Sequence, residues 1–186
     1  MDFNFKEHYR GVISIIGGSQ IDQKTWNYTE KIGELLAKNN YIISCGGLTG
    51  VMEAVCKGAK RANGLTIGII PFKDKSAANQ YVDIAIPVPF SQARNIIVVL
   101  SGDACVAIGG KAGTLSEICF AWIYKKPLIG FSSVDGWSSK MANKKIDDRR
   151  TDKIYDARTP KQVIELLNKI FSSELKDKES DFSDIF

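Results

Sequence analysis

The segment that most constrains the fold is residues 104–117, ACVAIGGKAGTLSE. Its first part, residues 104–108, is an apolar run that is followed at once by glycines. Such a run is typical of a buried parallel strand that ends in a tight turn. Glycine adopts positive φ freely and lets a ligand approach the backbone, so the turn is expected to be a place of close contact. The glycines of this turn are Gly109, Gly110 and Gly113.

A helix is expected to begin directly after this turn. Thr114 and, three residues later, Glu117 have the spacing of a capping box at a helix N-terminus. The start of a helix just beyond a strand end attracts anions, because its unpaired N–H groups and its dipole point at the ligand. Two interpretations of Glu117 stay open: it caps the helix, or it faces a ligand as a catalytic carboxylate.

The same pattern occurs a second time, in residues 45–53, CGGLTGVME. An apolar run at 41–44 precedes it, and a helix with Glu53 near its start is expected over 51–62. Two such turns in one chain predict two helix N-termini that converge on one phosphorylated ligand. The expected ligand-binding residues of the two turns are Gly46, Gly47, Thr49, Gly50, Gly109, Gly110, Gly113 and Thr114.

Apolar runs alternate with amphipathic segments along the rest of the chain. Strands are expected at 12–16, 41–44, 65–70, 82–88, 104–108, 127–131 and 154–157, and helices at 25–38, 51–62, 90–100, 118–124 and 163–171. This order predicts an α/β fold, a single-domain, doubly wound, Rossmann-like parallel sheet of six or seven strands flanked by helices. Ligands bind such sheets outside the carboxyl ends of the strands.

The first strand ends in Gly17-Gly18-Ser19 at that same edge. Gly18 and Ser19 are therefore candidate ligand contacts, although a plain strand-to-helix turn explains them equally well. The dinucleotide fingerprint G-x-G-x-x-G and the Walker A pattern are both absent from the sequence. NAD-dependent chemistry and P-loop ATP chemistry are thereby disfavoured.

Arg94 is a cation in the first turn of an otherwise apolar helix, which Ser91 is expected to cap. A cation at that end of a helix opposes the macrodipole, and a buried arginine needs a partner. These two costs favour a role in a site, where Arg94 pairs with a phosphate or a carboxylate, over an exposed position.

Composition limits the remaining classes of function. The chain has 186 residues with 44% hydrophobic residues, which fits one globular domain, residues 1–173, and an acidic tail, residues 174–186, expected to be disordered. The net charge of +4 does not indicate nucleic-acid binding, and no apolar stretch is long enough to span a membrane. No signal peptide is visible in the first residues, which points to the cytoplasm.

Cysteine and histidine usage argues against a metal site. The four cysteines have no C-x-x-C spacing and lie in apolar surroundings, so buried free thiols are expected. The one histidine, His8, lies near the N-terminus, which disfavours a histidine-based metal site or catalytic triad. Of the polar stretches, 72–80 is expected to be a surface loop or a lid, and 132–153 a solvated loop. Phe120, Trp122 and Tyr124 are expected in the core or in a subunit interface.

Three motifs together resemble a known family: CGGLTGVMEA, ARN at the head of a helix, and D-x-x-x-A-x-GG-x-x-GT-x-x-E. The family, once labelled lysine decarboxylase-like, includes the LONELY GUY-type cytokinin riboside 5′-monophosphate phosphoribohydrolases and the molybdenum cofactor carrier proteins. The resemblance runs from Val12 to about Phe171 and is closest to the carrier-like branch. In the hydrolase branch the arginine and the glutamate of these motifs are catalytic, and they match Arg94 and Glu117.

The chain departs from the hydrolase pattern at three points. Ile108 replaces the proline before the second glycine turn, Cys45 replaces the first of three glycines, and Asn95 replaces a lysine. Asn95 is nonetheless expected to contribute to ligand binding. The departures leave phosphate binding intact and weaken the case for cytokinin specificity. Apart from Lys111 in a glycine turn, nothing suggests a pyridoxal phosphate site.

The resemblance leaves two functions open. The first is hydrolysis of the N-glycosidic bond of a nucleoside 5′-monophosphate by Glu117 and Arg94, with no cofactor required. The second is a non-catalytic carrier of a phosphorylated pterin such as molybdenum cofactor. A nucleotide-sensing module that acts through a partner is a third hypothesis. No further domain in the sequence supports it. In each case the partner is a small phosphorylated ligand, and the resemblance implies a homodimer or homotetramer.

Overall fold

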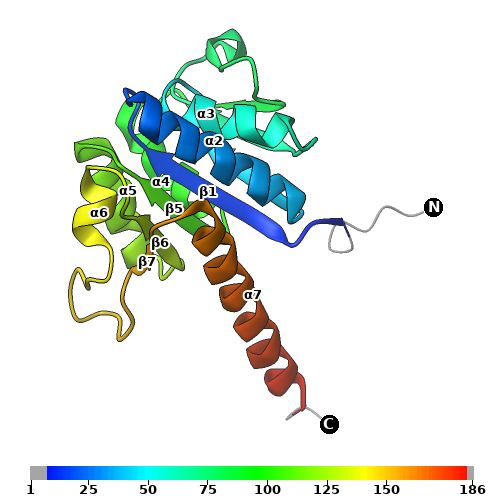
Figure 1. Ribbon diagram of the computed structural model, residues 1–186, viewed down its shortest axis with the longest axis vertical. Coiled ribbons are helices and arrows are strands. Elements are labelled where there is room, and N and C mark those ends of the chain that lie inside the picture. The colour runs from blue at the N-terminus through cyan, green and yellow to red at the C-terminus, as the bar shows by residue number, and fades with distance from the viewer. Residues whose placement is uncertain (1–7, 184–186) are drawn as a thin grey trace.

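The computed structural model describes residues 8–183, with the backbone alone described for 173–183. Seven strands form one sheet in the order β4-β3-β2-β1-β5-β6-β7, and every neighbouring pair is parallel. From β1 the chain first winds outward through β2, β3 and β4, then returns to the other side of β1 for β5, β6 and β7 (Figure 1). The predicted doubly wound α/β fold is confirmed, and its switch point lies between β1 and β5.

The elements follow one another along the chain as the apolar pattern predicts. The strands are β1 (Gly11–Gly17), β2 (Tyr41–Cys45), β3 (Thr66–Ile70), β4 (Ile84–Pro87), β5 (Ala104–Ile108), β6 (Leu128–Phe131) and β7 (Tyr155–Ala157). The α-helices are α2 (Gln23–Lys38), α3 (Val51–Lys60), α4 (Asn95–Leu100), α5 (Ala112–Ile123), α6 (Trp137–Met141) and α7 (Pro160–Ser183). Two 3₁₀ turns, η1 (Lys75–Ala77) and η2 (Ser91–Arg94), complete the set.

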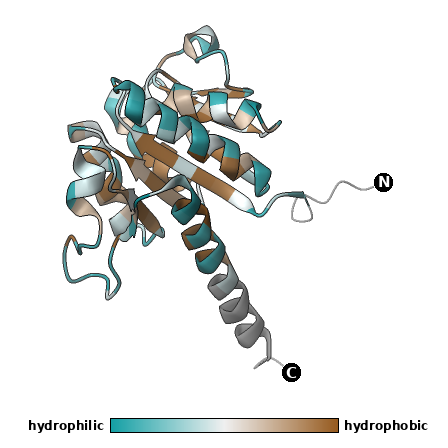
Figure 2. Ribbon diagram, viewed as in Figure 1, coloured by the Kyte–Doolittle hydropathy of each residue, from teal (hydrophilic) through white to brown (hydrophobic). Residues whose placement is uncertain are grey.

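The sheet is the apolar centre of the molecule, and its two faces carry separate cores. Successive residues of β1 point to opposite faces, so Ile15 packs with α2, α3 and α7, whereas Ile16 packs with α4 and α5. Figure 2 shows apolar strands between helices whose outward surfaces are polar. Burial of both faces explains why the central strands are continuous apolar runs rather than alternating ones.

Helices α2 and α3 lie against each other where two glycines meet. A Cβ at Gly58 would overlap the carbonyl oxygen of Glu30, and one at Gly33 would overlap that of Val55. This close packing fixes the position of α3 and therefore of the turn at its N-terminus, next to the end of β1.

The expected helix over 90–100 is wrong in its first half. Residues 91–94 form the 3₁₀ turn η2, and α4 begins only at Asn95. Ser91 is not a helix cap: its φ is +50°, and it lies inside η2 rather than before it. The tighter turn brings Arg94 into a buried position.

The polar stretch 132–153, expected to be a solvated loop, is largely tied to the domain. It contains α6, and the Arg150 guanidinium lies 4.8 Å from the centre of the Trp122 ring. Trp122 Nε1 donates to Asp147 Oδ1 at 2.7 Å, and Arg150 Nη1 donates to the Lys126 carbonyl at 2.8 Å. Trp122 is therefore a core residue, whereas Tyr124 is exposed.

The described part of the chain ends in helix α7, which Thr159 caps: its Oγ1 accepts from the Gln162 N–H at 3.2 Å. The helix continues to Ser183 and so passes through most of the acidic segment 174–186, for which the sequence predicts disorder.

The division of the chain at 173 stays a prediction. Residues 1–7, where no signal peptide is expected, and 184–186 lie outside the described part of the chain. Within the described part, no helix has the length and apolarity to cross a bilayer.

Candidate functional site

A cavity of about 590 Å³ opens at the carboxyl edge of the sheet, at the switch point between β1 and β5. Nine of the residues predicted for the site line it: Gly18, Ser19, Gly46, Arg94, Asn95, Gly110, Gly113, Thr114 and Glu117. Gly47, Thr49, Gly50 and Gly109 do not line it. The two glycine turns thus contribute to the cavity unequally.

The turn before α5 leaves the helix start open to the cavity. Helix α5 begins at Ala112 with Lys111 in the N-cap position, and the Lys111 side chain makes no capping hydrogen bond. The predicted capping box is therefore wrong, because Thr114 already lies within the helix. Gly110 has φ +84° and packs against the Thr114 side chain, in space that a Cβ would fill. The first N–H groups of a helix have no partner within it, and at this helix start Gly113 and Thr114 line the cavity.

The turn before α3 is closed by the loop that follows β1. The N–H of Val51, the first residue of α3, donates to the Gly18 carbonyl at 2.9 Å. The Thr49 hydroxyl donates to the Ser19 carbonyl at 3.1 Å. Gly50 has φ +70° and lies so close to Gly18 and Ser19 that a Cβ would overlap both. This turn therefore holds Gly18 and Ser19 in place at the cavity.

Arg94 is the most unusual residue of the cavity. Its side chain extends from the end of η2 and is only 8% exposed, and its buried Nη1 has no hydrogen-bond partner. The guanidinium lies against Gly46, where any Cβ would collide with it. Burial lowers the pKa of Arg94, and the nearby Glu117 opposes that shift. A buried cation with an unpaired donor is costly unless a ligand supplies an acceptor.

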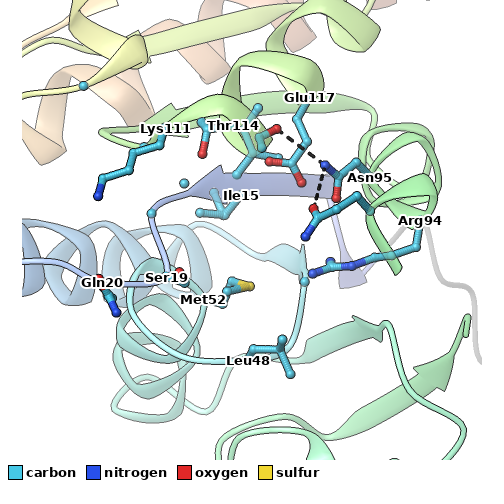
Figure 3. A pocket seen from close by; sticks show the side chains of 18 of the residues that line it. Ile15, Ser19, Gln20, Leu48, Met52, Arg94, Asn95, Lys111, Thr114 and Glu117 are labelled. Carbon is cyan, nitrogen blue, oxygen red and sulfur yellow. Dashed lines mark hydrogen bonds between the residues drawn. The ribbon is translucent and has the colours of Figure 1, made fainter. Parts of the chain in front are cut away.

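Glu117 extends into the same cavity from the second turn of α5 (Figure 3). It is 8% exposed, and burial raises its pKa to about 8, against the opposing influence of Arg94. No ion pair within 4 Å joins Glu117 to Arg94 in the described part of the chain. A pKa of about 8 keeps the Glu117 carboxyl mostly protonated at neutral pH, near the Arg94 guanidinium.

Asn95 connects the segment that carries Arg94 with helix α5, which carries Glu117. Its Nδ2 donates to Ser116 Oγ on α5 at 3.0 Å and lies 3.5 Å from Gln92 Oε1. These contacts tie the start of α4 to α5, the element that carries Glu117. Asn95 lines the cavity, but its amide is already in use.

Sequence reasoning missed several polar and apolar residues that line the cavity. They are Gln20, Leu48, Met52, Gln92, Lys111, Asp135 and Gly136. Met52 is 8% exposed and packs in the core while it also lines the cavity. A signal for Asp135-Gly136 was available: the pair follows β6 at the same carboxyl edge as the two glycine turns. The free cysteines Cys45, Cys56 and Cys105 are buried as expected, and Cys119 is half-buried.

Comparison with known proteins connects this chain to two groups. A model of the SLOG cluster4 family matches residues 10–164. An uncharacterised protein of Archaeoglobus fulgidus is 43% identical over 109 residues, which are 59% of this chain and 72% of that protein. A cytokinin riboside 5′-monophosphate phosphoribohydrolase of Arabidopsis thaliana is 27% identical over 156 residues, covering 77% of this chain and 68% of the relative.

Two solved structures are similar over nearly their whole length. The molybdenum cofactor binding protein of Rippkaea orientalis is 35% identical, with a TM-score of 0.77, over 86% of this chain and 96% of that one. The molybdenum cofactor carrier protein of Chlamydomonas reinhardtii is 26% identical, with a TM-score of 0.75, over 87% of this chain and 98% of that one. The sequence resemblance to the phosphoribohydrolase and carrier family is thereby confirmed.

Proposed function

The chain belongs to the SLOG cluster4 family, and on that premise we propose that its cavity binds a nucleoside 5′-monophosphate or a similar phosphorylated ligand. The observation that carries the proposal is Arg94, a buried guanidinium whose Nη1 has no partner and which lines the cavity. The cavity volume of about 590 Å³ lies within the roughly 300–1,000 Å³ of small-molecule sites. The open N-terminus of α5 supplies N–H donors of the kind that bind phosphate.

The proposed reaction is hydrolysis of the N-glycosidic bond. Because its pKa is raised to about 8, Glu117 holds a proton at neutral pH and can give it to the leaving base. The C1′–N bond breaks with its electron pair on the base, and the resulting carboxylate stabilises the cationic sugar. Water then adds to C1′ and returns a proton to Glu117. Arg94 holds the ligand against this carboxyl.

A second function, the carrier, has its own support. The molybdenum cofactor binding and carrier proteins match this chain over most of their length, one of them at 35% identity. The same anion-binding groups would hold a phosphorylated pterin without chemistry. Ile108 and Asn95, which depart from the hydrolase pattern, favour this function; the retention of both Arg94 and Glu117 favours the enzyme.

Turnover distinguishes the two functions. The purified protein and its Glu117→Gln variant are incubated with a panel of nucleoside 5′-monophosphates, and free base and ribose 5-phosphate are measured. The enzyme hypothesis predicts base release that the variant loses while it still binds. Glu53→Gln, which changes the corresponding carboxylate of the closed turn, is the matched control and keeps full activity. Tight retention of an intact ligand, without release, would support the carrier instead.

We also propose a homodimer or homotetramer. Helices α4 and α5 pack together, and four large apolar side chains on them are exposed: Ile97, Leu100, Ile123 and Tyr124. These residues, rather than the buried Trp122, are the proposed subunit interface. A monomer in sedimentation at micromolar concentration would contradict it. The free cysteines fit the cytoplasmic location that the sequence predicts.

A further inference from the structure

We infer that Lys111 is a specificity-determining residue, which selects ligands that end in a phosphomonoester and orients that phosphate on the N-terminus of α5. The inference rests on the proposed function. It places the phosphate of the ligand at Lys111 and the sugar toward Glu117 and Arg94. The family resemblance assigns no role to this position.

Lys111 occupies a position where a lysine is locally unfavourable. It is the N-cap residue of α5, where Ser, Thr, Asp or Asn would satisfy the first N–H groups, and its side chain makes no capping hydrogen bond. A cation at this end of a helix also opposes the macrodipole. Both costs disappear when an anion occupies the helix start, because the ammonium and the free N–H groups then act on the same charge.

The lysine is available to a ligand. Lys111 is exposed and lines the cavity, and no ion pair within 4 Å is formed by its ammonium in the described part of the chain. Asp135 lines the same cavity but does not neutralise it. A phosphomonoester carries up to two negative charges, which suits a site with both an ammonium and a helix start.

The two cations of the cavity lie on opposite sides of it. In Figure 3 Lys111 extends above Ser19 and Gln20, whereas Arg94 enters from the other side, beside Met52, with Thr114 and Glu117 between them. The buried, unpartnered Nη1 of Arg94 independently indicates a ligand in this cavity. With the phosphate at Lys111, the sugar and its glycosidic bond extend toward Glu117 and Arg94, and Arg94 is left to pair with a second acceptor of the ligand.

The test compares three probes by calorimetry: adenosine 5′-monophosphate, its phosphate monomethyl ester and adenosine. We expect Lys111→Gln to weaken binding of the monophosphate at least tenfold, to weaken the methyl ester less, and to leave adenosine unchanged. Lys111→Arg, which keeps the charge, should retain most of the affinity. Lys125→Gln removes an exposed lysine just beyond the other end of α5 and should change none of the three.

Thermal unfolding separates this role from a structural one. Removal of an unfavourable cation from a helix N-terminus should leave the melting temperature of Lys111→Gln equal to or above that of wild type. Monophosphate affinity equal to wild type, or an equal loss for adenosine, would overturn the inference while leaving the proposed function intact. If the wild type binds none of the three probes at millimolar concentration, the proposed function and this inference both fail.

Discussion

The two glycine turns read almost alike in the sequence, Gly46-Gly47-x-x-Gly50 and Gly109-Gly110-x-x-Gly113, yet the structure uses them differently. In the first turn the third glycine is the N-cap, and α3 starts after it. In the second turn the N-cap is Lys111, so Gly113 lies inside α5. Relative to the third glycine, α5 therefore starts two residues earlier than α3 does. This difference distinguishes the open turn from the closed one.

The start of α3 is closed by the loop after β1, whereas the start of α5 is open to the cavity. The carbonyl of Gly18 accepts from the first N–H of α3, so that end is already satisfied by protein. The N-terminus of α5 has no side-chain cap, and residues of its first two turns line the cavity together with Arg94. Similar sequence motifs therefore predict similar local shapes, but the neighbouring loop decides which helix start remains free for an anion.

The largest expected effect is that of Gly50→Ala. The backbone at Gly50 has φ +70°, and the added Cβ would overlap Gly18 and Ser19. We expect a loss of about 2–4 kcal/mol in the free energy of unfolding, from strain and steric overlap together. Urea denaturation measures it. A loss below about 0.5 kcal/mol, within the usual range for surface changes, would show that the turn is not closed as described.

Glu117→Gln should stabilise the protein in a pH-dependent way. The pKa of Glu117 is raised from 4.5 to about 8 in the folded protein, so the folded state binds more protons than the unfolded state between these values. The wild type therefore loses stability as pH rises through this window, and the variant does not. The variant's advantage should grow from pH 5 to pH 9 by on the order of 4 kcal/mol.

Urea denaturation at pH 5, 7 and 9 tests this prediction. An advantage that is the same at all three pH values would mean that the folded protein does not hold Glu117 in its protonated form. A gain in stability combined with loss of turnover would indicate that the site is maintained at a cost in stability.

Gly113→Ala should have the smallest effect on stability and an opposite sign from Gly50→Ala. Gly113 lies inside α5, and the nearest atom to an added Cβ is Gln92 Oε1 at 3.8 Å. Alanine is the better helix former, so we expect no loss and a gain of up to about 1 kcal/mol. Ligand affinity should fall, because the methyl group projects toward a residue that lines the cavity. A stability loss comparable to that of Gly50→Ala would remove the distinction between the turns.

The fold was largely predictable, because buried parallel strands leave continuous apolar runs between glycine turns. β5 was predicted to the residue, and Arg94 and Glu117 were predicted as site residues, which the structure places in one cavity at the sheet edge. The start of α5 was predicted wrongly, because Thr114 and Glu117 have the spacing of a capping box although the N-cap is Lys111. The closure of the α3 turn depends on Gly18, more than thirty residues away from Val51, and no local pattern records that contact.

The sequence also did not predict the positions of residues that follow the last strands of the sheet. Asp135 and Gly136 reach the cavity only because β6 lies beside β5. Arg150, in a charged stretch that resembles a solvated loop, stacks on Trp122 because the chain returns from α6 across that ring. In both cases a tertiary contact, rather than the local sequence pattern, decides where the residue lies.

The central claim, that the α5 turn binds the ligand and the α3 turn does not, is tested most directly by backbone amide NMR. A titration with adenosine 5′-monophosphate reports contacts residue by residue and detects even millimolar affinity, so the identity of the base matters little. We predict that the amide signals of Ala112, Gly113 and Thr114 shift strongly and that those of Val51 and its neighbours in α3 stay nearly constant. Strong shifts in the first turn of α3, with residues 112–114 unaffected, would contradict the account.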